Sequence, residues 1–443
     1  METIRFKILL VFSLCFLKIN TSFLSKIPQK YISDSTFISM TLKNQSPVAS
    51  SLYASPKGHG STCSSSSPCL LSTAVDKLKP GYVLYLKGGE YNVGEGISIE
   101  KSGSSGKYIV ITAVKGETPI ITSSSKKSEI PLFTIEPKMS YIIIENLTFK
   151  NVQARNVYGI ALYDGGQSHI IIRNNVFNSL KTTQSKDGYD TSAVLLVADK
   201  KIIKNVMIYH NKVSNMFLGY GEAISVMGNC ENIYVLNNTL TNNNNIAIDF
   251  NGNTGEYTLD GTLDQPRKSV AMFNRVEKSL SPYDDCAGIY VDGARDIYIY
   301  ENTVLNSQFG IEVGAENNDH KNAVTNIVVE NNKLIGNEKT AIRVGGYDTD
   351  SLIVRNTVFK NNQISKSKTS IIISKCNGIT FAGNHISDAT VYFVEMEKKF
   401  KNSISNVIFE KNVFSGTGNF IINGQTMSLA EFVKKYNTNT IKN

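Results

Sequence analysis

Residues 287–304 read AGIYVDGARDIYIYENTV, and this stretch decides the fold. It contains two short segments in which Ile or Val alternates with other residues, and the second runs into the phrase Asn302-Thr-Val304. Alternation with period two predicts strands that turn one side toward a core. The phrase of an Asn, a variable residue and an apolar residue recurs at Asn175, Asn211, Asn238, Asn274, Asn302, Asn332, Asn362, Asn384 and Asn412.

A second strand precedes the Asn strand in most of these repeats. Its copies begin at Gly159, Ala193, Ala223, Ala247, Gly288, Gly310, Ala341 and Ser370. Two or three strands in each repeat of roughly 22 to 30 residues, with almost no helical pattern, are typical of a solenoid whose coils stack on one another. We therefore predict an all-β, single-stranded parallel β-helix of about ten coils.

The recurring Asn residues are interpreted as structural. An Asn at the same corner of every coil can bond the equivalent residue of the next coil and form a ladder. Asn also tolerates the left-handed conformation that a sharp corner needs. The ladder explains these residues without any catalytic role.

Outward positions of the other strand carry the candidate chemistry. The residue between the two inward apolar positions is Ser225, Asp249, Tyr290, Glu312, Arg343 and Ile372 in successive coils. Neighbouring strands lie about 4.8 Å apart, so these side chains form one patch. The predicted catalytic residues are Asp249, Asp292, Glu312, Arg343 and Tyr290, and the predicted substrate-binding residues are Glu222, Asn251, Arg295, Glu316, Tyr347 and Asp348. The alternative is a solvated face with a ladder of surface ion pairs.

Two further features favour a binding groove over a plain surface. Glycines at 288, 293, 310, 314, 345 and 346 flank the column and suggest that something approaches the backbone there. Ile248 and Ile289 are 41 residues apart in sequence, which also predicts a long loop beside the column, over residues 253–285.

Three mechanisms can use such a patch. A hydrolase needs two carboxylates, such as Asp249 or Asp292 with Glu312. A lyase of uronic acids needs a base, an acid and a group that neutralises the substrate carboxylate. Ca²⁺ is the candidate cofactor for that last task, and its predicted ligands are Asp249, Asp292, Glu312 and Glu316. A non-catalytic binding module needs only the groove and its tyrosines.

The ends of the solenoid carry helical patterns. Residues 69–79 predict a short amphipathic helix that covers the first coil, and Ser428 with Glu431 forms a capping box that opens a helix through Tyr436. Cys63 and Cys69 flank a polar loop and can form a disulfide in an oxidising compartment. Cys230, Cys286 and Cys376 are expected to be buried small apolar residues.

The N-terminus predicts secretion. Arg5 and Lys7 precede an apolar run from Ile8 to Leu17, the order found in a secretory signal, although a retained anchor or buried helix is the alternative. We expect a signal peptide at residues 1–22, a linker at 23–50, the β-helix at 51–436 and a polar tail at 437–443. In a eukaryotic host, the acceptor patterns at Asn44, Asn146 and Asn237 would permit glycosylation.

Composition narrows the function further. Charged residues make up 19% of the 443 residues and the chain has 10 Pro, which excludes a coiled coil, collagen and bulk disorder. The net charge is +8, but the Lys and Arg residues are scattered, so we expect no nucleic-acid partner, and an acidic polysaccharide stays compatible. Beyond the first twenty residues no apolar stretch is long enough for a membrane span. We expect a monomer with no membrane partner.

The chain resembles the pectate-lyase-like superfamily of right-handed parallel β-helices. Three phrases and the coils carry the resemblance: Leu52 to Gly58, Lys79 to Tyr91, and Tyr108 to Ala113. The opening phrase is most similar to the β-helix pectate lyases that use a Lys base, but Lys186 to Asp190 matches their calcium motif only partly and Gly221 to Val226 offers no Lys. The resemblance implies a right-handed helix and a secreted lyase or hydrolase of acidic polysaccharide. A non-catalytic carbohydrate-binding or surface protein is the alternative.

Overall fold

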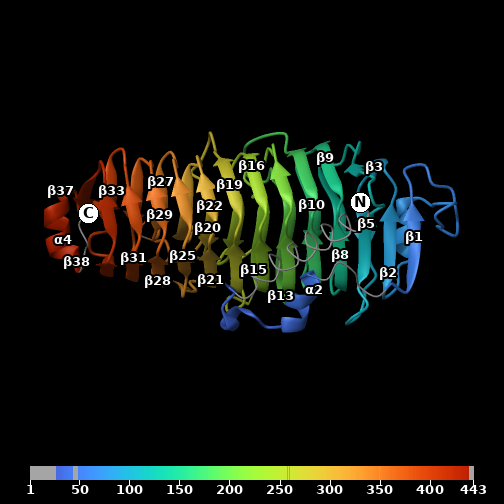
Figure 1. Cartoon of the computed structure of the whole chain (residues 1–443), viewed down its shortest axis with the longest axis horizontal. Helices are drawn as coiled ribbons and strands as arrows, with labels where there is room; N and C mark the ends of the chain where they lie inside the picture. The colour runs from blue at the N-terminus through green and yellow to red at the C-terminus, as the bar shows by residue number, and fades with distance from the viewer. Residues whose placement is uncertain (1–25, 43–47, 257, 259, 349, 439–443) are drawn as a thin grey trace, which may run out of the picture.

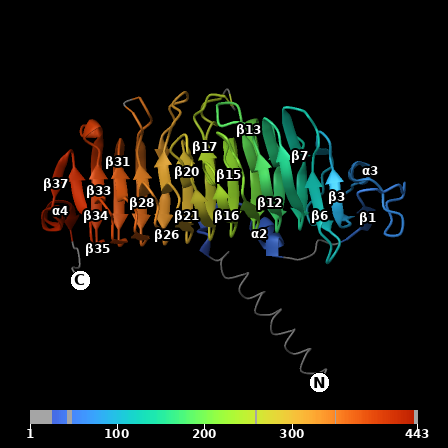
Figure 2. The same ribbon diagram turned by 90° about the horizontal axis from the view of Figure 1, so that it is seen from above.

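The computed structural model describes residues 26–42, 48–256, 258, 260–348 and 350–438. The chain winds as a right-handed parallel β-helix along one long axis, from β1 (Ser50–Ala54) at one end to α4 (Leu429–Tyr436) at the other (Figure 1). Figure 2 shows the same stack of coils from above. The predicted signal peptide at 1–22 and the glycosylation pattern at Asn44 lie outside the described residues.

Each coil contributes strands to three faces. The first face contains β4 (Ile97–Ile99), β7 (Glu129–Ile135), β10 (Asn156–Leu162), the first parts of β13 (Thr191–Tyr209) and β15 (Ile224–Leu236), β17 (Ile248–Asn251), β20 (Ala287–Asp292), β23 (Phe309–Gly314), β27 (Thr340–Val344), β30 (Thr369–Ile373), β33 (Tyr392–Met396) and β36 (Asn419–Ile422). The second face contains β1, β2 (Tyr82–Leu86), β5 (Ile109–Ala113), β8 (Ser140–Glu145), β11 (Ser168–Arg173), the later parts of β13 and β15, β18 (Arg267–Met272), β21 (Arg295–Tyr300), β24 (Val324–Thr325), β25 (Val328–Glu330), β28 (Val354–Lys360), β31 (Cys376–Ala382), β34 (Ile404–Glu410) and β38 (Asn437–Thr438).

The third face is a separate sheet of twelve strands among the described residues. They are β3 (Gly89–Asn92), β6 (Pro119–Thr122), β9 (Thr148–Gln153), β12 (Val176–Lys181), β14 (Lys212–Ser214), β16 (Thr239–Asn243), β19 (Arg275–Ser279), β22 (Thr303–Leu305), β26 (Lys333–Ile335), β29 (Gln363–Ser365), β32 (His385–Ser387) and β35 (Val413–Ser415). The chain therefore forms more coils than the ten expected, because its first coils lack the recurring Asn phrase.

The core is a continuous column of Ile, Val, Leu and Phe side chains between the three faces. Aromatic rings stack from coil to coil within it, as Phe359, Phe381 and Phe409 do at centroid distances of 4.9 and 4.8 Å. Parallel strands in exact coil-to-coil register place like residues above one another, so each inward position becomes an apolar stack. Burial of these stacks is the main favourable contribution to the fold.

The Asn ladder is confirmed. The Nδ2 of Asn302 donates to Oδ1 of Asn332 at 3.0 Å, and the backbone N–H of Asn302 donates to the same oxygen at 2.9 Å. The same pair of bonds joins every successive Asn from Asn175 to Asn412. The left-handed corner, however, belongs to the preceding residue, such as Asn331 at φ 57° or Asn361 at φ 54°. The ladder residue thus stays in register while its predecessor makes the turn.

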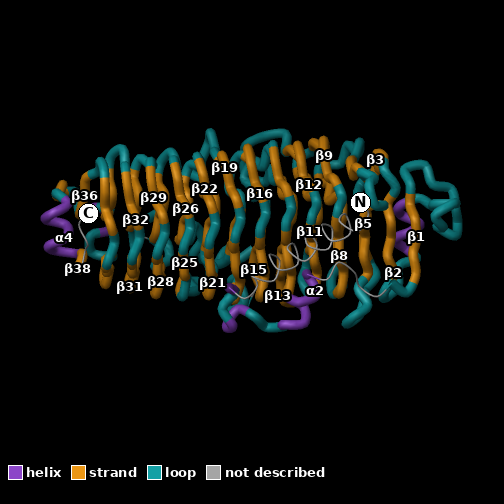
Figure 3. The backbone as a smooth tube through the Cα atoms, viewed as in Figure 1, coloured by secondary structure: helices purple, strands orange, loops and turns teal. Residues whose placement is uncertain are grey.

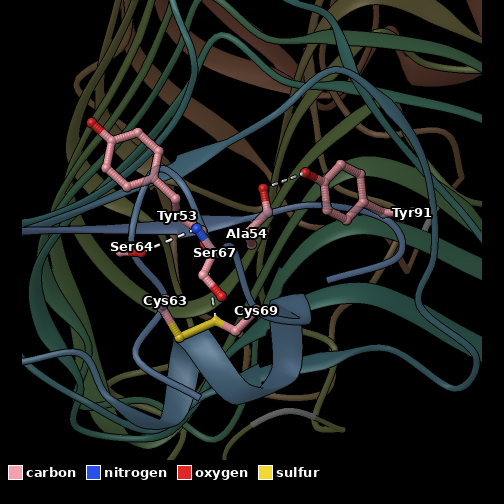
Figure 4. Close-up of a disulfide and its surroundings, with 7 residues drawn as sticks. All are labelled: Tyr53, Ala54, Cys63, Ser64, Ser67, Cys69 and Tyr91. Atoms are coloured by element: carbon pink, nitrogen blue, oxygen red, sulfur yellow. Dashed lines mark hydrogen bonds between the residues drawn. A yellow bond between two sulfur atoms is a disulfide. The ribbon is translucent and has the colours of Figure 1, made fainter. Parts of the chain in front are cut away.

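Both ends are capped as predicted (Figure 3). Helix α3 (Leu71–Asp76) packs against the first coils, and the disulfide between Cys63 and Cys69 closes the loop before it (Figure 4). At the C-terminal end, Ser428 Oγ accepts the N–H of Glu431 at 3.3 Å while the Glu431 carboxylate accepts the N–H of Ser428 at 2.7 Å, a capping box at the start of α4. The antiparallel hairpin of β36 and β37 (Gln425–Met427) precedes this helix.

The predicted tail and cysteines have mixed outcomes. Residues 437 and 438 form β38, which pairs with β34, so the tail begins inside the sheet and its last five residues lie outside the described part. Cys230, Cys286 and Cys376 are free and buried, as expected. No helix within the described ranges is long and apolar enough to cross a membrane.

Part of the predicted linker is a packed strap. Residues 26–42 contain the turn η2 (Gln29–Tyr31) and helix α2 (Ser35–Leu42) and lie across the outside of the second face, below β13 in Figure 1. Tyr31 and Phe37 are each 1% exposed, and Tyr31 stacks on Tyr298 at 5.6 Å. The sequence prediction missed this because the outer side of the second face is itself apolar, with Met207 and Tyr234 fully buried beneath the strap.

Candidate active site

The predicted column exists in register. Asp249 pairs with Tyr290, Tyr290 with Glu312, and Glu312 with Arg343 on four successive strands of the first face. Asp292 stands two residues beyond Tyr290 and pairs with Gly314. These side chains point away from the core, because their neighbours Val291 and Val313 belong to it.

The column is not the exposed stripe that the sequence predicted. Asp249, Tyr290, Asp292 and Glu312 are each 1% exposed. Tyr290 packs with Phe309 and Tyr347 in an apolar cluster outside the core, and the backbone N–H of Glu316 donates to Asp292 Oδ1 at 2.8 Å. The alternative of a solvated face with a surface ion-pair ladder is therefore wrong at these positions.

Two loops lie beside the column and are joined by side-chain amides. Asn253 donates to the carbonyls of Gly293 and Asn322 at 3.0 and 3.2 Å, and Gln265 donates to those of Gly293 and Ala323 at 2.8 and 3.1 Å. The ring of His320 also contacts Asp264 at 2.9 Å. The predicted loop over 253–285 is shorter than expected, because β18 and β19 occupy its middle and complete an ordinary coil.

A cleft of about 510 Å³ opens at one end of this column. One part of its lining is apolar or aromatic, with Tyr158, Tyr163, Leu195 and Met227. The other part is acidic and contains Glu129, Asp187, Asp190, Glu222, Glu256 and Glu316. No Lys or Arg belongs to the lining among the described residues. Flat rings beside carboxylates suit a sugar, which presents both apolar ring faces and hydroxyl groups.

Two carboxyl groups of the cleft, Glu222 and Asp190, have raised pKa values. Burial, with smaller contributions from the charges of Asp190 and Glu316, raises the pKa of Glu222 to about 8, against the opposing effect of the hydrogen bond from Ser225. Burial also raises the pKa of Asp190 to about 6, with a smaller contribution from Asp187 and an opposing one from Arg155. Neighbouring carboxylates with raised and different pKa values are typical of acid–base catalysis.

Asp249 is the most unusual acid of the group. Both of its carboxylate oxygens are buried and accept no hydrogen bond from the described residues. Burial raises the pKa of Asp249 well above its ordinary value, the charges of Glu222, Asp292 and Glu316 add to that rise, and the nearby side chain of Asn251 opposes it. The same causes, burial first and then Glu316, raise the pKa of Asp292.

Glu312 belongs to a different network from the cleft. It accepts a hydrogen bond from Tyr347 Oη at 2.5 Å and pairs with Arg343 Nε at 3.1 Å. Arg343 also lies over the Tyr347 ring at 4.3 Å and 3.7 Å from Glu397. Burial raises the pKa of Glu312 to about 8, against the effect of Arg343. This network stabilises the middle of the first face, next to the acidic cluster.

The structure does not bring every predicted residue to the cleft. Asn251, Glu222 and Glu316 line it. Arg295 instead begins β21 on the second face and pairs with Asp296 at 2.7 Å. Asp348 is exposed and closes a turn by accepting the N–H and hydroxyl of Ser351 at 2.7 and 2.9 Å.

Close packing within the chain explains the two glycines Gly288 and Gly293 beside the column. A Cβ on Gly288 would meet the core side chain of Val304 at 2.4 Å, and one on Gly293 would meet the carbonyl oxygen of Gly252 at 2.4 Å. At these two positions the groups that approach the glycine are parts of the chain itself. The prediction that glycines mark the approach of a ligand is wrong there.

The predicted calcium ligands do not form a metal group. Asp249, Asp292, Glu312 and Glu316 are near one another, but Glu312 is held by Arg343 and Tyr347 and Asp292 by a backbone N–H. Within the described ranges no three or more His, Cys, Asp or Glu side chains are arranged to hold a metal ion. The calcium prediction is therefore not carried into the reaction proposed below, and no chemical step is assigned to the ion.

Sequence reasoning missed Asp190 and the tyrosines of the cleft. Asp190 ends the segment Lys186 to Asp190, which partly resembles a calcium motif, and lies directly before β13. The sequence could have indicated Asp190 because it lies one coil before Glu222, and β13 and β15 are paired neighbours. Gly221 also marks the contact, because a Cβ there would lie 3.2 Å from Cβ of Asp190 and 2.8 Å from the backbone N of Thr191.

Comparisons with known proteins agree on the fold. Residues 52–216 match the family described as "Pel9A-like, right handed beta helix region", and residues 287–441 match "Right handed beta helix region". The chain is 32% identical over 342 residues to the uncharacterized protein YwoF of Bacillus subtilis (strain 168), which covers 73% of this chain and 71% of YwoF.

Solved structures with the same fold act on or bind sugars. The complex of XylC with xylose matches with a TM-score of 0.52 at 10% identity, over 88% of this chain and 86% of XylC. A mannuronic acid specific polysaccharide family 6 lyase from human gut microbiota matches with a TM-score of 0.50 at 13% identity, over 89% and 91% of the two chains. A GH136 lacto-N-biosidase from Eubacterium ramulus matches with a TM-score of 0.50 at 12% identity, over 83% and 68%. At such low identity these likenesses show the fold alone.

Proposed function

Because the chain belongs to the family of right-handed β-helix proteins that includes YwoF, we propose that it is a carbohydrate-active enzyme that hydrolyses glycosidic bonds in the acidic cleft. The observation that carries this proposal is the pair Glu222 and Asp190, two cleft carboxyl groups that lie just before the neighbouring strands β15 and β13 and have pKa values of about 8 and about 6. At neutral pH the first is mainly protonated and the second mainly ionised. That is the division of roles that glycoside hydrolysis requires.

In the proposed reaction Glu222 is the general acid. Its carboxyl group donates a proton to the glycosidic oxygen as the bond from that oxygen to the anomeric carbon breaks. Asp190 is the general base, which takes a proton from the water that attacks the anomeric carbon. Ser225, in β15, donates from Oγ to Glu222 Oε2 at 2.7 Å and so orients the acid.

Asp249 and Asp292 lie close to this pair. Burial raises the pKa of both, and the charge of Glu222 is among the causes that raise them further. Tyr158, Tyr163 and Tyr220 line the same cleft and offer ring faces on which a sugar can stack. Asp249 and Asp292, which sequence analysis placed in catalysis, are assigned no proton transfer in this reaction.

The cleft favours a hydrolase over a lyase of acidic polysaccharide. A lyase must neutralise the substrate carboxylate, but Lys and Arg are absent from the described lining, and the ionised carboxylates of the lining would repel a polyuronate. Arg343, a predicted catalytic residue with a positive charge, is engaged by Glu312 and Tyr347. We extend the sequence-based prediction of secretion to this proposal, and the disulfide between Cys63 and Cys69 supports an oxidising compartment.

The test is a panel of neutral, amino and acidic glycans incubated with the purified protein. Hydrolysis releases reducing ends without an unsaturated product that absorbs in the ultraviolet. Glu222→Gln and Asp190→Asn should each lose activity by about 10²- to 10⁴-fold, whereas Glu338→Gln, an exposed carboxylate outside the cleft, should keep it. Parallel reactions with CaCl2 and with EDTA test the predicted calcium dependence.

Other results would select the other functions. Ultraviolet-absorbing products would show a lyase. Glycan binding with no product from any member of the panel would show a binding module. Full activity in both carboxylate variants would remove the cleft from the reaction.

A further inference from the structure

We propose that the cleft selects glycans that carry protonated amino groups, that is, polymers of amino sugars with free amines. This inference rests on the proposed function, which leaves the sugar open. It names the chemical class of substrate from the charge and the hydrogen-bonding capacity of the cleft.

The first observation is the sign of the charge at the cleft. Carboxylates line it, and the nearby cations are already engaged. Arg155 Nε donates to the carbonyl of Gly188 at 2.7 Å and its guanidinium lies 5.0 Å from the centre of the Tyr189 ring. Lys186 also lies over that ring, at 4.9 Å. A positively charged sugar would therefore meet a negative field at the cleft, and a uronic acid would be repelled.

The second observation is independent of charge and concerns hydrogen-bond acceptors without donors. Asp249 is 1% exposed, and neither of its carboxylate oxygens accepts a hydrogen bond from the described residues. Asn251 lines the cleft on the same side of the same strand, and its Oδ1 is also buried and unpartnered. Buried polar atoms are nearly always hydrogen-bonded, so such acceptors mark a place for donors.

Asp249 lies next to residues of the cleft but is not itself part of the lining. Its register partner on the preceding strand is Ser225, whose hydroxyl binds the cleft residue Glu222. The charges of Glu222 and Glu316, both of the lining, act on it directly. The unpartnered acceptors therefore belong to the acidic cluster rather than to the core.

An ammonium group supplies what this cluster lacks. It brings one positive charge and three N–H donors and has no acceptor. Hydrogen bonds from a charged donor to a carboxylate are about twice as strong as neutral ones. A cation can also interact favourably with the faces of Tyr158, Tyr163 and Tyr220 around the cleft. A neutral N-acetyl group offers one donor and adds an acceptor, so it fits this cluster less well.

The experiment compares three matched oligosaccharides by calorimetric titration of the whole protein near pH 6.5. They are a glucosamine hexamer, its fully N-acetylated counterpart and a galacturonate hexamer. We expect the amine hexamer to bind at least about tenfold more tightly than the acetylated one, which is the effect of about one charge-assisted hydrogen bond. The galacturonate hexamer should show no binding.

Two kinds of variant test the assignment. Asp249→Asn keeps the size of the side chain and should reduce the preference for the amine by about tenfold. If that variant does not fold, the double variant Asp187→Asn, Glu256→Gln changes two exposed residues of the lining and should reduce the same preference. Glu338→Gln is the matched control and should leave all three affinities unchanged.

The outcomes separate this inference from the proposed function. Equal or tighter binding of the acetylated hexamer overturns the inference, and hydrolysis of that hexamer alone does so while leaving the proposed function intact. Selective binding of the amine hexamer without hydrolysis supports the inference and overturns the proposed function. If CaCl2 displaces the amine hexamer and admits galacturonate, the cluster holds a metal cation and the inference is wrong.

Discussion

Asp249 and Tyr290 are register partners on adjacent strands of the first face, and both are buried with their polar oxygens unpartnered among the described residues. The pairing places a carboxylate beside a phenol outside the core. Burial raises the pKa of each group, and nearby acids raise both further. Replacing such residues with ones that cannot ionise would make the fold more stable. Their presence is therefore typical of a functional site.

Asp249→Asn should stabilise the protein at alkaline pH. The raised pKa means that the folded chain disfavours the ionised form, so the free energy of unfolding decreases as pH rises above the ordinary Asp value of 3.8. Asn cannot ionise and avoids that loss. We expect a gain of about 1–3 kcal/mol in denaturant unfolding at pH 8 and almost none at pH 3.5. Glu338→Gln should show no such difference, and a destabilised Asp249→Asn variant at pH 8 would contradict the prediction.

Glycan hydrolysis should follow a bell-shaped pH profile. The active form has Asp190 ionised and Glu222 protonated, so kcat/KM should rise with pH through about 6 and fall through about 8. Replacement of Asp187 by Asn should move the acidic limb to lower pH, because the charge of Asp187 raises the pKa of Asp190. A profile that is flat between pH 5 and 9, measured by reducing-end release, would contradict both assignments.

The fold could be predicted from sequence because the same residue types recur at the same position of each coil and have the same structural role there. Asn302 and its equivalents stack in the ladder, and the alternating apolar residues define the faces, so the register of Asp249 with Tyr290 and Glu312 follows from the pattern alone. Coil-to-coil contacts are local and repeat, which makes the pattern sufficient.

The site could be predicted only in part, because its depth depends on segments that do not repeat. The amides of Asn253 and Gln265 join two loops beside the column, and these residues are not part of the sequence repeat. The loops and Tyr347 bury acids that the alternation had placed on an exposed surface. Asp190 belongs to the site because it lines the cleft. The shape of that cleft depends on the size of neighbouring side chains such as Tyr158 and Leu195, which the repeat does not specify.

Loss of one residue from the middle of the Asn ladder should destabilise the whole chain. Asn302→Ala leaves the buried N–H groups of Asn274 without their acceptor and removes the side-chain donor to Asn332. We expect a loss of roughly 2–4 kcal/mol in the free energy of unfolding. Asn377→Ala, which removes a single exposed contact to Asn406, is the control and should change stability by less than about 0.5 kcal/mol. Similar losses in both variants would mean that the ladder adds no more than a surface bond.

Removal of the strap should expose an apolar surface without unwinding the coils. The strap covers Met207, Tyr234 and Tyr298 on the second face, and Tyr234 Oη donates to the carbonyl of Tyr31 at 2.8 Å. A chain without residues 26–42 should keep the far-ultraviolet spectrum of the β-helix, because the strap contributes no strand to it.

The same truncated chain should bind an apolar dye and associate in solution, since exposed apolar patches of this kind promote contacts between molecules. A milder variant, Phe37→Ala, should show faster hydrogen exchange in β13 and β15 than the intact chain, because Phe37 is 1% exposed and contacts His169 and Tyr234. Lys30→Ala, an exposed residue of the same segment, provides the control. If the truncated chain stays monomeric and binds no dye, the second face is stable on its own and the strap is only a surface attachment.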